Sequence, residues 1–290
     1  MTDICAENVR ELLPQRAPDA NKYTVGTLLL VCGSYSMAGA CVLCAKAALR
    51  SGVGLVRCAV PKGIYPIVSC SVPEAVFMVL EENAQGALSA SSAREIVKAA
   101  ECADAVVFGC GSRLCADTES LAVTLLTECS TPIIIDADGI NALAKHINVL
   151  DEAKCRVVLT PHEGEMSRLS RISAEKIREN REEAAQSFAD AHDCVLVLKG
   201  MDTLVARKGK EIRRNTTGNA GMAVAGSGDV LSGIMGGLLA QGLRTVDAAT
   251  LGVYIHGRAG DLAAMEYTEY SMLPTDIIGH IPAVFKELIR

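Results

Sequence analysis

The sequence lacks any apolar stretch of the roughly 18 to 20 residues that a transmembrane helix needs. Even the run from Thr27 to Cys32 is only as long as a strand. The segment from Met1 to Pro14 mixes charged and apolar residues, and so lacks the apolar core of a signal peptide. We therefore expect a cytoplasmic protein without a membrane partner.

The sequence also lacks an excess of basic over acidic residues. The chain has 34 acidic and 28 basic residues, a formal net charge of −6 and a pI near 5.5. These charges are spread along the chain, whereas binding to nucleic acids or acidic membrane surfaces requires clustered positive charge. The composition therefore argues against those partners, and small molecules remain as the expected binding partners.

Internal repeats, low-complexity tracts and proline-rich linkers are absent, so nothing in the sequence marks a domain boundary. With 290 residues, of which 50 % are hydrophobic, the chain can bury one large core. We predict a single domain over residues 1–290.

The twelve cysteines lack the partners that a zinc or redox site needs. Cys41 and Cys44 have the spacing of a metal or redox pair, but they fall in a helical pattern with neither a second pair nor a histidine nearby. The other cysteines, such as Cys32 and Cys110, lie in apolar strand patterns. We interpret them as reduced, buried thiols that pack as small hydrophobic groups.

Strand and helix patterns alternate along the chain, which predicts an α/β fold with a mostly parallel sheet covered by helices on both faces. The expected strands are 28–31, 55–60, 76–80, 105–109, 133–136, 157–160 and 195–199, followed by a hairpin over 203–216. The clearest expected helices are 39–50, 92–101, 118–129, 174–189, 229–241 and 246–265.

Glycine-rich or polar residues directly follow five of these strands, and in parallel sheets ligands bind beyond the carboxyl ends of the strands. The five strand exits are 33–34, 109–112, 136–138, 160–165 and 199–200. We expect them to converge on one candidate site.

The run Gly226-Ser227-Gly228-Asp229 carries the most chemical information. Its small residues leave backbone N–H groups bare where a helix begins, which favours an anion. A carboxylate at that point, Asp229, can accept the proton of a hydroxyl that attacks a phosphoryl group. The alternative is that Asp229 only offsets the helix dipole and that the glycines only allow close packing.

The other strand exits each allow a functional and a structural interpretation. His162 could hydrogen-bond a substrate and Glu163 or Glu165 could bind Mg²⁺, directly or through water, or these residues could only cap the following helix. Asp136 and Asp138 could attract Mg²⁺ or substrate hydroxyls, although Asp138 is also a good N-cap. Lys199 could approach nucleotide phosphates or be a solvated lysine in a turn.

Together these segments resemble the ribokinase-like superfamily and, within it, the ADP- or ATP-dependent NAD(P)H-hydrate dehydratases. The resemblance lies in residues 33–54, 160–165, 199–203 and 218–233, and in a tail, 271–276, where Pro274 departs from the family pattern. It implies a three-layer αβα sandwich and a lyase that repairs a damaged metabolite. Such an enzyme phosphorylates the ring hydroxyl of S-form hydrated NADH or NADPH, and then eliminates phosphate.

The resemblance also implies the roles of particular residues. The hydrated cofactor would contact Ala40, Gly111, His162 and Asp229, with Asp229 as the catalytic base. The adenine nucleotide, ADP or ATP, would contact Lys199, Gly200, Met201, Asp202, Thr203 and Gly228. Gly226, Ser227 and Gly228 would form the anion hole, Mg²⁺ would assist, and the protein would be a homotetramer.

Two other functions remain open at this point. One is a kinase for a thiamin-precursor alcohol or a sugar on the same fold; those kinases more often have asparagine where His162 stands here and often have cysteine in place of Asp229. The other is a nucleotide-binding regulatory protein without catalysis. The presence of both a base and an anion hole argues against the second.

Overall fold

The computed structural model describes residues 1–289, and within them the strands form one sheet of ten strands in the order β1-β10-β9-β8-β7-β6-β5-β2-β3-β4. All neighbouring strands run parallel except those paired with β9, which is antiparallel to both β8 and β10. The strands are β1 (Thr2–Asp3), β2 (Thr27–Val31), β3 (Leu55–Pro61), β4 (Val76–Leu80), β5 (Ala105–Phe108), β6 (Ile133–Ile135), β7 (Val157–Leu159), β8 (Val195–Leu198), β9 (Thr203–Arg207) and β10 (Arg213–Asn215).

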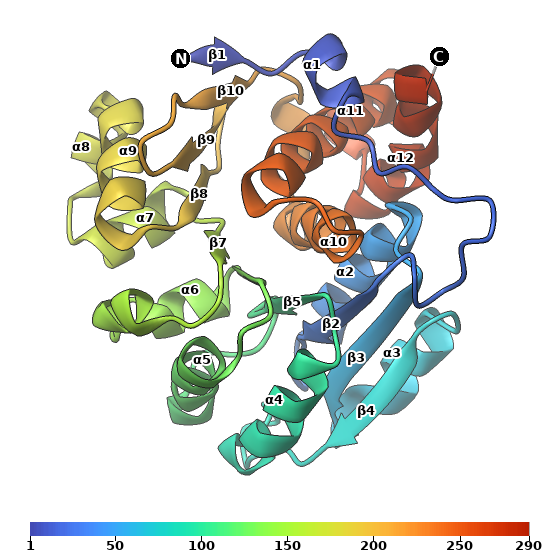
Figure 1. Ribbon diagram of the computed structural model, residues 1–290, viewed down its shortest axis with the longest axis vertical. Coiled ribbons are helices and arrows are strands. Elements are labelled where there is room, and N and C mark those ends of the chain that lie inside the picture. The colour runs from blue at the N-terminus through green and yellow to red at the C-terminus, as the bar shows by residue number, and fades with distance from the viewer. Residues whose placement is uncertain (290) are drawn as a thin grey trace.

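Helices cover both faces of this sheet, with α2, α10, α11 and α12 on one side and α4 to α9 on the other (Figure 1). The first side also carries α1 and α3. Their bounds are α1 (Ala6–Arg10), α2 (Ala38–Arg50), α3 (Tyr65–Ser71), α4 (Ala93–Glu101), α5 (Ala116–Glu128), α6 (Asp138–Leu143), α7 (Glu163–Ser170), α8 (Ala174–Glu179), α9 (Arg181–His192), α10 (Ser227–Ala240), α11 (Thr245–Ser271) and α12 (Pro274–Ile289). Short 3₁₀ turns lie at 62–64, 90–92, 147–152 and 220–222.

The sheet divides the apolar interior into two cores, because successive side chains of a strand point to opposite faces. In β2, Leu28 and Leu30 face the α10 side, whereas Leu29 and Val31 face the α5 side. The same alternation is found in β6 and β8. The continuous apolar runs of the sequence therefore reflect burial on both faces.

The seven predicted strands and the β9–β10 hairpin are all present, which confirms the predicted mostly parallel sheet between helix layers. Some details were predicted wrongly. Residues 174–189 form two helices, α8 and α9, because Asn180 has φ −143° and ψ 65°, outside the helical region. Asp138 is the first residue of α6 and not its N-cap, which is Ala137; its carboxylate instead accepts from the Arg113 N–H at 2.8 Å.

The order of the strands reverses at β2, which lies between β3 and β5. The chain runs outward from β2 through β3 to β4, then returns to the other side of β2 at β5 and continues through β6 to β8. Such a reversal opens a crevice at the carboxyl ends of the two strands where the chain directions diverge, here β2 and β5. Gly33 and Gly109 follow these two strands, and the Gly33 N–H donates to the carbonyl of Cys110 at 2.8 Å.

Helix α10 packs closely against α2 and the sheet because glycines line its contacts. A Cβ on Gly233 would lie 2.2 Å from the carbonyl oxygen of Cys44, and one on Gly236 would lie 2.6 Å from Val107 Cγ2. Pro274 opens α12, where its fixed φ suits the first turn, and contacts the turn at Gly226. These contacts fix where the N-terminus of α10 meets the crevice.

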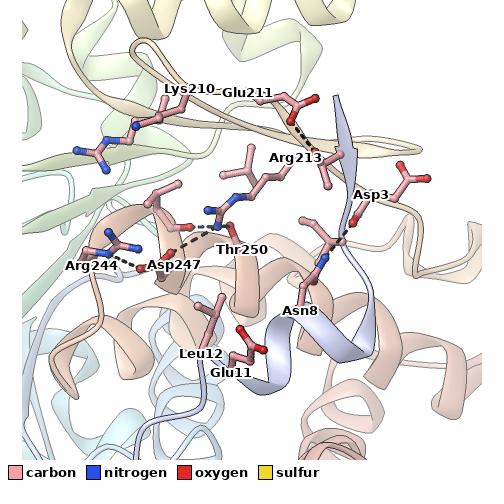
Figure 2. A pocket seen from close by; sticks show the side chains of 15 residues that line it. Asp3, Asn8, Glu11, Leu12, Lys210, Glu211, Arg213, Arg244, Asp247 and Thr250 are labelled. Carbon is pink, nitrogen blue, oxygen red and sulfur yellow. Dashed lines mark hydrogen bonds and ion pairs between the residues drawn. The ribbon is translucent and has the colours of Figure 1, made fainter.

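A cavity of about 580 Å³ lies elsewhere, between the N-terminal segment, the β9–β10 hairpin and the start of α11 (Figure 2). Several of its charged groups form ion pairs. Arg213 and Arg244 both pair with Asp247, and the Met1 amino group pairs with Glu211. The unpredicted strand β1 pairs with β10, and the ion pair between Asp3 and Arg214 adds to this attachment of the N-terminal segment.

Across residues 1–289, none of the helices combines the length and the apolar character needed to cross a membrane.

We predict that Gly233→Ala lowers the free energy of unfolding by about 1–3 kcal/mol, because the added methyl group must push α10 away from α2. Urea denaturation measures this change. Gly279→Ala is the matched control, since an added Cβ at this exposed position of α12 meets nothing within 4 Å. The control should raise stability by up to about 1 kcal/mol; equal losses in both variants would contradict the packing argument.

Candidate active site

Asp136 is the centre of a polar network at the carboxyl ends of the strands. It follows β6 and is 1 % exposed. Its Oδ1 accepts from Lys199 Nζ and Thr160 Oγ1, both at 2.7 Å, and its Oδ2 accepts from Ser232 Oγ at 2.8 Å. The Cys110 thiol donates to the same Oδ2 at 3.8 Å. The network thus joins the ends of β5, β6, β7 and β8 to helix α10.

The charges of this network stabilise each other. Burial opposes ionisation of Asp136, but the Lys199 ammonium and the hydrogen bonds outweigh it and hold the pKa of Asp136 below its usual value. Burial likewise opposes the Lys199 charge, yet Asp136 and Glu165 raise the pKa of Lys199. The interpretation of Lys199 as a solvated lysine is therefore wrong.

Helix α10 begins at Ser227, two residues earlier than predicted, and its N-cap Gly226 has φ +97°, a conformation that favours glycine. The Ser227 N–H donates to the carbonyl of Val224 at 3.2 Å, and the helical hydrogen bonds start with the Val230 N–H donating to Gly226. The N–H groups of Gly228 and Asp229 lie between these two bonds. They precede the helical ladder, where a helix offers free donors.

Lys199 extends toward this helix start. A Cβ added to Gly228 would lie 3.4 Å from Lys199 Nζ and 3.7 Å from Asp136 Oδ2. Lys199 therefore lies beside the glycine-rich turn. An anion placed at the helix start would meet both N–H donors and an ammonium group.

Asp229 lies in the first turn of α10 beside the polar network. One of its carboxylate oxygens, one oxygen of Asp136 and the sulfur of Cys110 lie within 4.8 Å of one another. Burial, with Cys110 and Asp136 nearby, raises the pKa of Asp229 to about 9. Two neighbouring carboxyl groups therefore have opposite preferences: Asp136 is ionised at neutral pH and Asp229 holds its proton.

His162 and Glu165 form a capping box at the start of α7. His162 Nδ1 accepts from the Gly164 N–H at 3.0 Å, and Glu165 Oε2 accepts from the His162 N–H at 2.9 Å. The capping interpretation of His162 is confirmed. Glu165 Oε2 also lies 3.8 Å from Lys199 Nζ, so the box adjoins the network. Burial raises the pKa of Glu165, while Lys199 acts against this rise.

Ala40 and Gly111 meet at the crevice between β2 and β5. Gly111 has φ +62°, and a Cβ added there would lie 2.7 Å from the Cβ of Ala40. Two hydroxyls from the same strand exits, those of Ser34 and Ser112, are buried without a hydrogen-bond partner among residues 1–289. Because buried polar groups normally have a hydrogen-bond partner, these hydroxyls are further candidate ligand-binding groups of the site. Their position after a glycine at the end of a strand was the only sequence signal for them.

The loop 199–203 is shaped by Arg181, which the sequence did not indicate. Its guanidinium donates to the carbonyl oxygens of Leu198, Lys199 and Met201 at 2.6 to 3.3 Å. Gly200 and Asp202 have φ +140° and +55°, so the backbone turns sharply. Met201 is 87 % exposed at the tip.

His256, interpreted as structural from the sequence, contacts the start of α10. Its Nε2 lies 3.3 Å from Ser227 Oγ, and burial lowers the pKa of His256 to about 4. The ring is therefore neutral and shares a hydrogen bond with Ser227.

The carboxylates of the site differ in their suitability for Mg²⁺, which binds through oxygen ligands and keeps several waters. Both oxygens of Asp136 already accept hydrogen bonds, and its cluster with Asp229 includes a thiol, which is a poor ligand for a hard cation. Glu165 Oε1 is 3.5 Å from His162 Nε2 and is less engaged. The donor set thus fits a cation held by Glu165 through water.

Residues 28–283 match the family model described as NAD(P)H-hydrate dehydratase. The chain is 41 % identical over 279 residues to a bifunctional NAD(P)H-hydrate repair enzyme of Moorella thermoacetica, covering 96 % of this chain and 53 % of that protein. It is 36 % identical over 250 residues to an ADP-dependent (S)-NAD(P)H-hydrate dehydratase of Neisseria meningitidis, covering 85 % and 80 %.

Solved structures agree with these relatives. An ADP/ATP-dependent NAD(P)H-hydrate dehydratase from Bacillus subtilis, co-crystallised with ATP/Mg²⁺, has a TM-score of 0.85 and 28 % identity, covering 99 % of this chain and 98 % of that one. A ribokinase from Thermotoga maritima has a TM-score of 0.55 at 14 % identity, covering 90 % and 99 %, which shows a shared fold alone. The predicted ribokinase-like α/β fold is confirmed.

We predict that Lys199→Met lowers the free energy of unfolding by about 3–5 kcal/mol, because it leaves the Asp136 carboxylate buried without its cation. The double variant Lys199→Met/Asp136→Asn should recover a large part of this loss. Lys145→Met, which breaks the exposed pair with Glu119, is the control and should change stability little. A double variant no more stable than Lys199→Met would contradict a charge-based origin.

We also predict that Asp229→Asn stabilises the protein, and more so at higher pH. Because the folded pKa of about 9 exceeds the usual value of 3.8, wild-type stability is full below pH 3.8 and declines as pH rises toward 9. The uncharged amide removes this decline. Urea denaturation at pH 5 and pH 8.5 should show a larger gain at pH 8.5, and a pH-independent difference would refute the raised pKa.

Proposed function

The chain belongs to the NAD(P)H-hydrate dehydratase family, and from this premise we propose that it uses ADP or ATP to dehydrate the S form of hydrated NADH or NADPH. The single observation that carries this proposal is the position of Asp229, in the first turn of α10 beside Lys199 and Asp136. A strongly basic carboxylate and an anion-binding helix start stand together there. That is the arrangement needed to transfer a phosphoryl group to a hydroxyl.

In the proposed reaction, Asp229 first loses its proton to solvent, and the resulting carboxylate is a strong base because of its high pKa. This carboxylate removes the proton of the ring hydroxyl while that oxygen attacks the terminal phosphoryl group of the nucleotide. The bond to the nucleotide's bridging oxygen breaks, and the shorter nucleotide leaves. The N–H groups at the start of α10 and the Lys199 ammonium stabilise the charge on the transferred group. The ring nitrogen then donates its electron pair as the carbon–oxygen bond breaks and phosphate leaves. Loss of a proton from the neighbouring ring carbon to solvent restores the carbon–carbon double bond.

The nucleotide is assigned to the loop from Lys199 through Gly200, Met201 and Asp202 to Thr203, together with Gly228. Lys199 lies beside the helix start and the loop runs from there to β9, so phosphates and base could lie along it in that order. Gly226, Ser227 and Gly228 form the turn of the anion hole, with the Gly228 N–H as its free donor. When bound, Mg²⁺ would be held by Glu165 through water and would neutralise phosphate charge.

The hydrated nicotinamide is assigned to the crevice between β2 and β5, where Ala40 and Gly111 meet, with His162 and Asp229 at its far side. A glycine at 111 leaves room there, since a Cβ would already collide with Ala40.

The chain spans about half the length of the bifunctional relatives it matches, so the activity of the whole protein is part of the proposal. We infer a cytoplasmic enzyme whose partners are the hydrated cofactor and the adenine nucleotide. The homotetramer remains a prediction.

The decisive experiment follows the absorbance of the reduced nicotinamide after hydrated NADH is mixed with the protein and either ADP or ATP. We predict recovery of absorbance only with nucleotide, and a loss of turnover of about 10²–10⁴-fold in Asp229→Asn, the usual contribution of a general base. Asp104→Asn, at the opposite end of the sheet, is the control. Stable accumulation of a phosphorylated product would indicate a kinase instead.

A further inference from the structure

Three buried cysteines from different segments meet beneath the proposed active site. Cys32 follows β2, Cys44 lies in α2 and Cys110 follows β5, and each is 0 % exposed. Their three sulfur atoms all lie within 4.8 Å of one another. The group forms at the crevice where the strand order reverses, so it joins residues that are far apart in the sequence.

The partners of Cys44 differ from those that its sequence spacing suggests. The sulfur of Cys44 groups with those of Cys32 and Cys110, and Cys41 is not part of this group. Cys41 instead neighbours Cys58, which together with burial raises the pKa of Cys41. The spacing of Cys41 and Cys44 therefore gave no indication of the three-thiol group, which only the fold brings together.

The geometry is close to that of a metal thiolate. With metal–sulfur bonds of about 2.3 Å, three sulfurs around one ion lie about 4 Å apart. The three sulfurs here need to move by less than about 1 Å to reach that spacing. Thiolates prefer soft cations such as Cu⁺, Zn²⁺ and Cd²⁺ over Mg²⁺.

We propose that Cys32, Cys44 and Cys110 form a three-thiolate site for one soft cation. Binding a divalent ion to three thiols releases three protons to solvent and leaves one net negative charge on the site. The positive charge of the Lys199 ammonium interacts with Cys110. It can therefore partly neutralise the negative charge of the occupied site.

The site is coupled to the polar network through Cys110. In the metal-free protein its thiol donates to Asp136 Oδ2 and lies within 4.8 Å of Asp229. A metal-bound thiolate has no proton to donate and places negative charge beside both carboxylates. Occupation of the site should therefore also inhibit any chemistry that depends on Asp229.

Equilibrium titration with Cd²⁺ tests the proposal, using the ultraviolet thiolate-to-metal charge-transfer band and proton release. The exposed Cys5, Cys70 and Cys102 are replaced by serine in every protein, so that they do not contribute. We expect one tightly bound Cd²⁺, proton release on binding and a set of three sulfur ligands by X-ray absorption. Cys44→Ala should weaken binding by at least about 100-fold, since losing a ligand exceeds the 10- to 100-fold effect of losing an outer-shell partner.

Cys58→Ala is the matched control, because it removes a buried thiol of the same face outside the group. It should bind Cd²⁺ as the parent protein does. Equal affinities in Cys44→Ala and Cys58→Ala, or fewer than three sulfur ligands, would overturn the proposal. Cys44→Ser, which keeps the size of the side chain, gives the same comparison if the alanine variant folds poorly. These readouts use no nucleotide or hydrated cofactor, so they are independent of the proposed dehydratase activity.

Discussion

The buried ion pair between Asp136 and Lys199 is the interaction on which the rest of the site depends. Its partners are 63 residues apart, and Ser232, which also bonds Asp136, is 96 residues away. Burying two charges is costly unless their geometry and remaining hydrogen bonds are satisfied. Here Thr160, Ser232 and Cys110 donate the remaining hydrogen bonds to Asp136. The ends of four strands and helix α10 must therefore be correctly placed relative to one another before the ion pair can form.

That arrangement explains how two carboxyl groups at one site acquire opposite behaviour. Asp136 has a cation and hydroxyl donors, whereas Asp229 is buried near a thiol and the Asp136 charge. Separation of the pKa values of neighbouring groups is how proteins assign acid and base roles. The close packing of α10 through Gly233 and Gly236 holds Asp229 in an environment that disfavours a negative charge. The helix cannot move away from the sheet without losing these packing contacts.

The sequence was sufficient to predict those parts of the structure that depend on residues close together in the chain. Apolar runs predicted β2 to β8, and the small residues around Gly226 predicted a helix start with a bare backbone, because both depend on neighbouring residues. It was insufficient where partners are distant in sequence. Neither the role of Arg181 in shaping the 199–203 loop nor the pairing of Asp136 has a local signal. The break at Asn180 was hidden because the apolar periodicity continues across it.

The structural and functional interpretations of His162 are compatible, because one ring nitrogen caps helix α7 and the other can donate a hydrogen bond. Nδ1 accepts the N–H groups of Gly164 and Glu165, which places the proton of the neutral ring on Nε2. Burial, with Lys199 and Arg168 nearby, lowers the pKa of His162 and so favours that neutral ring. The side chain is still 55 % exposed, and its Nε2 lies 3.5 Å from Glu165 Oε1, so the Nε2–H donor has a fixed orientation beside Glu165. Capping therefore does not compete with ligand binding; it sets the tautomer and the orientation that a hydrogen bond to a bound substrate would need.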